Sequence, residues 1–201
     1  MNKQPKLDQI KTDIVQSNIC PDLAQTANNL VFGSGNLNAD VLFIGEAPGK
    51  KEDMSGLPFI GAAGKMLDKM LSEISLNRDQ VYITNIVKYR PPDNRDPKPD
   101  EKNAFWPYLV KQIEVIDPKL VVTLGRHPMN AFLPNAKIGE VHGISSVVNI
   151  QKESIGKPVV ILPLYHPAAA LYNGGLRETL SKDFENIALI INKLKKRKLK
   201  E

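Results

Sequence analysis

The chain has 201 residues, of which 42% are hydrophobic and 24% are charged, a composition typical of a globular protein with one sizeable core. No apolar run is long enough to cross a bilayer and no signal-peptide pattern opens the sequence, so we expect no membrane association and a cytoplasmic location. The single cysteine excludes an internal disulfide and a metal site built from cysteines alone, and the net charge of +5 favours a polyanionic partner.

Four short apolar runs predict buried strands. They cover residues 41–45, 81–87, 120–124 and 159–164. Helical patterns lie between these runs, and strands that alternate with helices imply βαβ units. We therefore predict the α/β class, with a mainly parallel sheet covered by helices on both faces. We expect one domain over residues 1–201, with a basic tail at about 193–201.

Three segments carry the helical patterns. In the stretch 64–75, apolar residues recur at helical spacing and define one face. That face consists of Leu67, Met70, Leu71 and Ile74. Residues 100–116 begin with an acidic first turn that favours a helix N-terminus, and Pro107 inside them predicts a kink or a late start. Residues 178–196 form an amphipathic helix near the end of the chain.

Polar residues stand where three of the predicted strands end. Glu46 follows the first strand, Asn85 lies within the second, and His166 follows the fourth. In parallel sheets the ligand site lies beyond the carboxyl ends of the strands, so we expect these three side chains at one edge. Each has a plain alternative: a solvated turn glutamate, a buried amide with satisfied hydrogen bonds, and an ordinary strand-end histidine. Their convergence favours a site.

Two loops extend this picture. Phe59 lies among glycines and a proline in "GLPFIG", where it is either a core side chain or a stacking surface for a flat ligand. The stretch "KYRPPDNRDPKP" is an irregular basic loop, which is either a rigid connector or a contact for phosphates. The candidate phosphate contacts are Lys88, Arg90, Arg95, Lys98 and the lysines of the tail.

Three segments resemble family 4 uracil-DNA glycosylases, the thermostable-type branch of that superfamily. They are "GEAPGKKEDMSGLPFIGAAGKML", "VYITNIVKYRPPDNRDPKPDE" and the shorter "HPAAAL". The resemblance runs from about "VFGSGN" to the last helix. It implies a three-layer α/β/α fold with a central four-stranded sheet. It also implies hydrolysis of the N-glycosidic bond of deoxyuridine in DNA, which leaves an abasic site and starts base-excision repair.

The resemblance implies a role for each candidate. Glu46 matches the acidic residue that positions water and stabilises the sugar cation, and His166 matches the histidine that supports negative charge on uracil O2. Phe59 matches the aromatic ring that stacks on uracil, and Asn85 matches the amide that hydrogen-bonds its edge. The substrate-binding residues implied in this way are Ala47, Gly49, Phe59 and Asn85. Glycosylases that act on duplexes flip the base out, which needs such a pocket.

The chain departs from the family at its iron–sulfur positions. Members usually hold a 4Fe–4S cluster with four cysteines. The corresponding positions here are Ser17, Cys20, Tyr89 and Phe105, so only Cys20 is retained. We therefore predict no metal, no cluster and no cofactor, with Tyr89 and Phe105 filling the vacated volume, together with Trp106, as an apolar plug.

The histidine motif also departs from the family. Members usually carry a bulky leucine four residues after the histidine, whereas this chain has Ala170, Leu171 and Tyr172 in that region. Leu171 is then the candidate wedge that fills the gap left by a flipped base. His142 stands where the family more often has arginine. These changes predict lower activity on duplex than on single-stranded DNA, where unpairing costs nothing.

Two functions of different classes follow. The first is an active uracil-DNA glycosylase that works as a monomer on single- or double-stranded uracil-containing DNA, in the cytoplasm and near the nucleoid in a prokaryote. The second is a DNA-binding relative with the same fold and weak or no catalysis, which the lost cysteines suggest and the retained site residues oppose. A Rossmann-type nucleotide enzyme is disfavoured because "GEAPGKKEDMSG" lacks the glycine and Walker lysine patterns.

Overall fold

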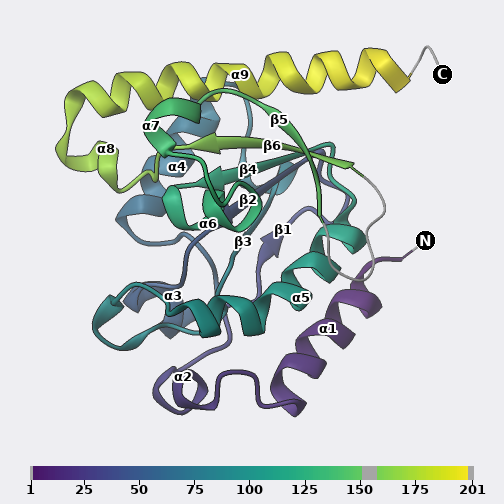
Figure 1. The fold of residues 1–201 in the computed structure, drawn as a ribbon, viewed down its shortest axis with the longest axis vertical. Helices are drawn as coiled ribbons and strands as arrows, with labels where there is room; N and C mark the ends of the chain where they lie inside the picture. Colours follow the sequence, from purple (N-terminus) through teal and green to yellow (C-terminus); the bar gives the residue numbers. More distant parts are fainter. Residues whose placement is uncertain (1, 151–157, 199–201) are drawn as a thin grey trace.

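The computed structural model describes residues 2–150 and 158–198 (Figure 1). Its sheet contains six strands in the order β1-β3-β2-β4-β6-β5. The central strands are β3 (Tyr82–Asn85), β2 (Val41–Gly45), β4 (Leu120–Leu124) and β6 (Pro158–Leu164), and they all run parallel. They coincide with the predicted apolar runs, so the predicted parallel core of the sheet is confirmed.

Two short edge strands were not predicted. β1 (Ser34–Gly35) pairs antiparallel with β3, and β5 (Ser146–Asn149) pairs antiparallel with β6. Neither is a buried apolar run: β1 has two residues, and β5 alternates half-buried with exposed positions. The prediction of a four-stranded sheet therefore described its parallel centre and missed both edges.

Helices cover both faces of the sheet (Figure 1). They are α1 (Gln4–Gln16), α2 (Pro21–Thr26), α3 (Lys50–Ser55), α4 (Ala62–Glu73), α5 (Pro99–Ile116), α6 (Arg126–Phe132), α7 (Ile138–Val141), α8 (Ala169–Tyr172) and α9 (Gly174–Lys198). Turns of 3-10 helix lie at Arg78–Gln80 and Pro92–Asn94. α1 and α5 pack on one face and α4 and α9 on the other, so the predicted three-layer α/β/α architecture is confirmed.

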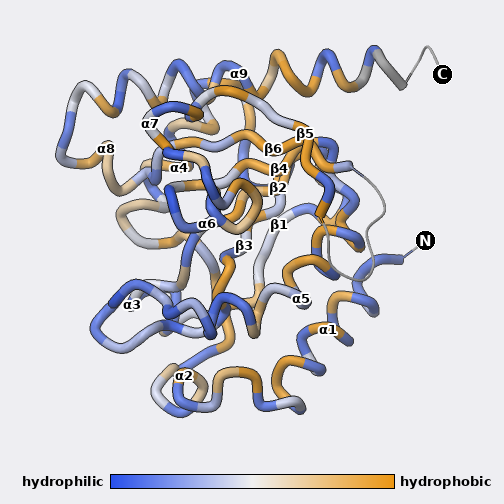
Figure 2. Tube along the Cα trace, in the orientation of Figure 1, coloured by the Kyte–Doolittle hydropathy of each residue, from blue (hydrophilic) through white to orange (hydrophobic). Residues whose placement is uncertain are grey.

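The alternation of side chains along β2 builds the two cores. Leu42 and Ile44 belong to the core beneath α1 and α5, whereas Val41 and Phe43 belong to the core beneath α4 and α9. Phe43 stacks on Phe184 of α9 with ring centroids 6.0 Å apart. Figure 2 shows the result: the central strands β2, β4 and β6 are mainly hydrophobic, and α9 alternates between hydrophobic and hydrophilic residues. Among the described residues, no helix is both long and apolar enough to span a membrane.

The predicted helices form with small differences in their ends. α5 runs from Pro99 through an exposed Pro107 without a break, so the predicted late start is wrong. Its N-terminus is capped by Glu101, whose carboxylate accepts a hydrogen bond of 2.7 Å from the backbone N–H of Lys98. α9 begins four residues earlier than the pattern predicted and includes residues 193–198 of the basic tail, while residues 199–201 lie outside the described residues.

Candidate active site

At the carboxyl ends of the parallel strands, the order in which the chain adds strands to the sheet reverses beside β2. From β2 the chain passes to β3 on one side of β2, and it then returns to form β4 on the other side of β2. Ligands of open α/β sheets bind at such a topological switch point. Gly45 at the end of β2 is in register with Asn85 at the end of β3, so the first two predicted site segments are neighbours.

A pocket of about 220 Å³ opens at this edge. It is lined by Ala47, Gly49, Glu52, Phe59, Gly61, Ala62, Ala63, Asn85 and His166. The structure therefore brings together the predicted base-binding residues and His166 around one cavity. Glu46 precedes this lining directly along the chain, and its side chain faces α6.

Asn85 points an unsatisfied oxygen into the site. Its side chain is 1% exposed, and its Oδ1 has no hydrogen-bond partner among the described residues. A buried amide oxygen without a donor costs about 1–3 kcal/mol, which a ligand donor would offset. Gly45 makes room for it: a Cβ atom built there would overlap Oδ1 and lie 2.5 Å from the ring of Phe59.

The ring of Phe59 is held by a strained backbone. Phe59 has a φ of 53°, in the left-handed region that non-glycine residues seldom adopt. Arg78 fixes this conformation because its guanidinium donates to the carbonyls of Pro58 and Phe59. Asp68 of α4 in turn holds Arg78, with Oδ1 2.5 Å from Nε. Sequence analysis missed Arg78, which lies almost twenty residues from the loop that it supports.

Glu52 supports the same loop from the other side. Its Oε1 accepts hydrogen bonds from the backbone N–H groups of Ile60 at 2.9 Å and Gly61 at 2.7 Å. These groups lie at the N-terminus of α4, where a carboxylate is favoured. Glu52 was also missed, although it is the third helical residue of "GKKEDMS" after the motif glycine.

His166 is held as a neutral imidazole with one defined tautomer. The backbone N–H of Ala168 donates to its Nδ1 at 3.2 Å, so the proton of the neutral ring lies on Nε2. Burial lowers the pKa of His166 to about 4, which leaves the ring uncharged at neutral pH. Its ring centroid lies 5.8 Å from that of Phe59.

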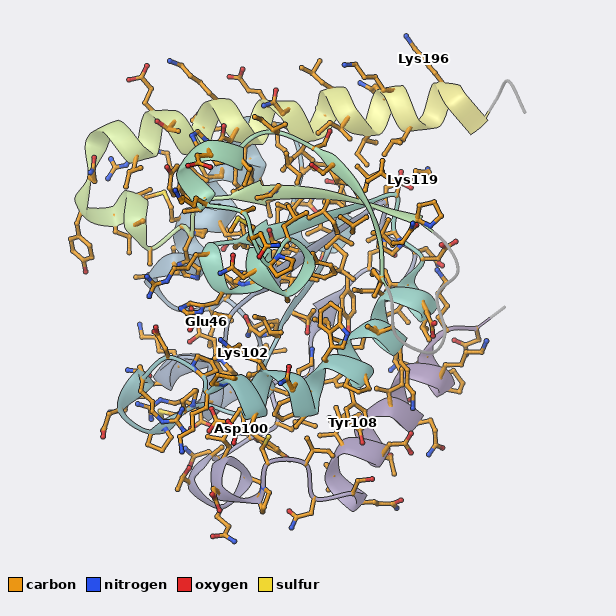
Figure 3. All side chains as sticks on the ribbon, viewed as in Figure 1. Glu46, Asp100, Lys102, Tyr108, Lys119 and Lys196 are labelled. Atoms are coloured by element: carbon orange, nitrogen blue, oxygen red, sulfur yellow. The ribbon has the colours of Figure 1, made fainter. Side chains whose placement is uncertain are left out.

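Glu46 lies in a charged, half-buried setting beside α5 and α6 (Figure 3). Its Oε1 is 3.7 Å from Nε2 of His127. Burial raises the pKa of the Glu46 carboxyl, while the charges of His127, Lys102 and Arg126 act in the opposite direction. In Figure 3 Lys102 of α5 lies close to Glu46 at the edge of the sheet.

Lys88 corrects one predicted DNA contact. Its side chain is completely buried, and Nζ donates to Oγ1 of Thr84 and to the backbone carbonyl of Asn85, each at 2.7 Å. Burial lowers the pKa of this amine well below its usual range. A side chain in this position cannot reach a phosphate, so the prediction for Lys88 is wrong. It supports instead the backbone that carries Asn85.

The other basic candidates differ in whether their side chains are free to contact a phosphate. Arg95 forms a bidentate pair with Glu101, with N–O distances of 2.5 and 2.9 Å. Arg90 is half-buried and donates from Nε to Oδ1 of Asn94 at 2.9 Å. Lys98 is exposed. Arg95 therefore has a carboxylate partner within the protein, whereas among the described residues Arg90 is bound only to a neutral amide.

Leu171, the predicted wedge, is less exposed than the next residue, Tyr172. Leu171 of α8 is half-buried and packs against the core beneath α9. Tyr172, the next residue, is 93% exposed. An exposed aromatic ring at the end of the histidine segment offers a stacking surface that Leu171 does not.

The four positions that correspond to the cluster cysteines of the family hold a serine, one cysteine and two aromatic residues. Phe105 is fully buried and lies edge-on to Tyr89, with ring centroids 5.9 Å apart. Cys20 is half-buried, and burial next to acidic groups raises the pKa of its thiol to about 11. Clusters of this kind are bound by thiolates. These positions therefore do not fit the four-cysteine ligand set of the family.

Comparison with known proteins gives three similar enzymes, each a type-4 uracil-DNA glycosylase. That of Sulfurisphaera tokodaii is 47% identical over 187 residues, covering 90% of this chain and 83% of the relative. That of Archaeoglobus fulgidus is 46% identical, covering 93% and 94%. That of Saccharolobus solfataricus is 45% identical, covering 90% and 84%.

This likeness overturns the prediction that the protein carries no cofactor. Type-4 uracil-DNA glycosylases are a family known to carry an iron–sulfur cluster, and nothing in the structure establishes a cofactor-free state. The prediction rested on the replaced cysteines alone.

The family model of the uracil DNA glycosylase superfamily matches residues 32–195. The matched region contains the strand ends, the pocket with Phe59, Asn85 and His166, and the glutamate beside it. On this match and on the identities above, the chain belongs to the uracil-DNA glycosylase superfamily, with type-4 uracil-DNA glycosylases among its relatives.

Proposed function

We propose that the protein is a uracil-DNA glycosylase, which hydrolyses the N-glycosidic bond of deoxyuridine in DNA and leaves an abasic site. One observation carries the proposal. Asn85, whose buried side-chain oxygen has no hydrogen-bond partner among the described residues, lines a pocket together with Phe59 and His166, and Glu46 stands beside it. This is the arrangement that a flipped pyrimidine and its sugar require. The product makes the enzyme the first step of base-excision repair.

Uracil suits the pocket chemically. Its N3–H donates to Oδ1 of Asn85, and its O4 accepts from the amide nitrogen of the same side chain. The ring lies against Phe59, whose backbone conformation is fixed by Arg78. Ala47 and Gly49 line the remaining wall and leave space for the base.

Bond cleavage then uses two groups at opposite ends of the site, the neutral imidazole of His166 and the carboxylate of Glu46. The C1′–N1 bond breaks with its electron pair moving to the base, so negative charge develops on uracil and positive charge on the sugar. The Nε2–H of neutral His166 donates to uracil O2 and stabilises the anion. The carboxylate of Glu46 stabilises the sugar cation, orients a water toward C1′ and accepts its proton. No step passes through a cluster.

The DNA partner follows from the reaction, and we propose its finer features as well. The enzyme acts as a monomer on both single- and double-stranded uracil-containing DNA, with a phosphate contact from the half-buried Arg90 and a stacking contact from the exposed ring of Tyr172. Residues 1–201 form one glycosylase domain. Because the proposed substrate is DNA, we place the enzyme in the cytoplasm, and at the nucleoid if the cell is prokaryotic.

The test compares the wild type with Glu46→Gln on a labelled single-stranded oligonucleotide containing one uracil, with alkali to cut abasic sites. We expect a loss of about 10²–10⁴-fold in the single-turnover rate, with DNA binding retained. Glu185→Gln, an exposed carboxylate of α9, is the matched control and should leave the rate unchanged. A wild type that binds uracil-containing DNA but cuts neither single nor double strands would favour the non-cleaving, DNA-binding relative.

A further inference from the structure

The stretch "GRHP", which comprises Gly125 and the first turn of α6, places a histidine beside Glu46. Gly125 has a φ of 99°, and a Cβ atom built on it would lie 3.1 Å from Cβ of His166. The turn therefore packs directly against the histidine of the pocket. Two residues later, the side chain of His127 is 19% exposed and lies beside Glu46, whose side chain is 26% exposed.

His127 stands between two carboxylates from different segments. Its Nε2 is 3.1 Å from Oδ2 of Asp96 and 3.7 Å from Oε1 of Glu46. Asp96 belongs to the loop before α5. Arg126 contacts both partners, because its Nη2 lies 3.2 Å from Oδ2 of Asp96 and its Nε donates to Nε2 of His127 at 3.2 Å. Three segments distant in the sequence thus meet at one imidazole: the loop after β2, the loop before α5, and α6.

The charges around Glu46 come from each of these segments. His127 and Arg126 of α6 and Lys102 of α5 are cationic or can become so, and Asp96 is anionic. Burial raises the pKa of the Glu46 carboxyl, and His127 is the largest of the charges that lower it. A carboxylate that must be ionised to stabilise a sugar cation needs such a neighbour.

We propose that His127 is a positioning residue for Glu46: held by Asp96, it orients the carboxylate and keeps it ionised in its half-buried setting. The catalytic meaning of the bridge rests on the proposed function, because it takes Glu46 as the carboxylate that faces the sugar. The bridge itself, in which Nε2 of His127 contacts Asp96 at 3.1 Å and lies within ion-pair distance of Glu46 at 3.7 Å, is a property of the structure. It explains why an otherwise unused motif, "GRHP", occupies the turn beside the pocket.

The first experiment measures single-turnover uracil release from a single-stranded oligonucleotide between pH 4 and 9. His127→Gln removes the neighbour that most lowers the pKa of the Glu46 carboxyl, so the acidic limb of the profile moves up by about one pH unit. Asp96→Asn keeps an acceptor oxygen for Nε2 and removes a negative charge, so its acidic limb moves down.

Shifts of the acidic limb in opposite directions in His127→Gln and Asp96→Asn would distinguish a positioning role of His127 from a role in packing alone. A merely structural His127 would lower the rate by the same factor at every pH and leave the midpoint in place, and that result would overturn the proposal. His142→Gln is the matched control, because His142 forms a similar pair with Asp183, 2.8 Å apart, away from Glu46. Its acidic limb should coincide with that of the wild type.

A second readout does not depend on activity. The carboxyl carbon of Glu46, assigned with Glu46→Gln, is titrated by NMR in the wild type and in His127→Gln. A midpoint that rises in the variant supports the bridge even if the wild type releases no uracil, in which case the proposed function alone fails. An unchanged midpoint overturns the bridge, whatever the enzyme does to uracil.

Discussion

At the scale of single residues, the pocket depends on one missing side chain. Gly45 has no Cβ, and this absence lets the amide of Asn85 and the ring of Phe59 meet at the end of β2. Its backbone carbonyl accepts a hydrogen bond of 2.9 Å from the N–H of Ile86, which fixes the strand end that carries the next residue, Glu46. A glycine here is a requirement of space rather than of backbone conformation.

Replacing Gly45 with alanine therefore tests the site directly. The new Cβ would overlap Asn85 and press on Phe59, so both side chains must move. Misplacement of a binding group by about 1 Å can cost about 10²-fold in rate, and we expect a loss of that order in single-turnover uracil release. Thermal unfolding measured alongside would show whether the variant still folds.

Gly174→Ala is the control for this variant. A Cβ atom built at Gly174 meets nothing within 4 Å, and alanine is the better helix former. This variant should keep the wild-type rate and unfold at the same temperature or slightly higher. If Gly45→Ala cleaves uracil as fast as Gly174→Ala does, the pocket described above is not where the base binds.

The residues that the sequence could and could not predict differ in a physical way. Glu46, Asn85 and His166 could be placed because polar residues at the ends of apolar strands converge on one edge. Lys88 could not, because a basic residue beside a basic loop looks exposed. The chain beyond β3 continues into the interior, where the carbonyl of Lys88 accepts a hydrogen bond from Val31.

At the scale of elements, the parallel strands were predictable and the edges were not. Strands buried on both faces must be apolar throughout, so β2 and β4 appear in the sequence with their observed bounds. β1 and β5 gain their strand geometry from pairing with a central strand, which no local pattern records. The position of His127 likewise depends on how α6 packs beside β2, not on its own spacing.

The short helix α8 leads to a prediction about the relative rates on duplex and single-stranded DNA. Its Tyr172 is 93% exposed, whereas Leu171 packs on the core. Stacking of an aromatic ring on a base contributes about 1–3 kcal/mol. If Tyr172 occupies the space left by a flipped base, Tyr172→Ala should slow uracil release from a U·A duplex by about tenfold or more, with a much smaller effect on single strands.

The duplex and single-strand rates are measured by single turnover with excess enzyme on matched oligonucleotides. Leu189→Ala, an exposed apolar residue of α9, is the control and should alter neither rate. Equal losses on duplex and single strand would indicate that Tyr172 supports the pocket instead. A duplex defect in Leu171→Ala but not in Tyr172→Ala would restore the wedge first predicted from the sequence.

At the scale of the whole molecule, the net charge of +5 overstates the cations available to DNA. Lys88 is buried and Arg95 is paired with Glu101, so two of the basic candidates beside the site are already used within the protein. A phosphate contact releases counterions, and each one contributes to the slope of log K against log salt concentration. The slope therefore counts the free cations, not the total charge.

The last prediction uses that slope to separate Arg90 from Arg95. We measure binding of a uracil-containing single strand by the inactive Glu46→Gln protein at several salt concentrations, and then add either Arg90→Gln or Arg95→Gln. Removing a true phosphate contact reduces the slope by about one, so Arg90→Gln should flatten the plot. Arg95→Gln should leave the slope in place and lower thermal stability, because its guanidinium holds the carboxylate that caps α5. The reverse pattern would mean that Arg95 leaves Glu101 to bind DNA, and the loop before α5 would then have to rearrange on the substrate.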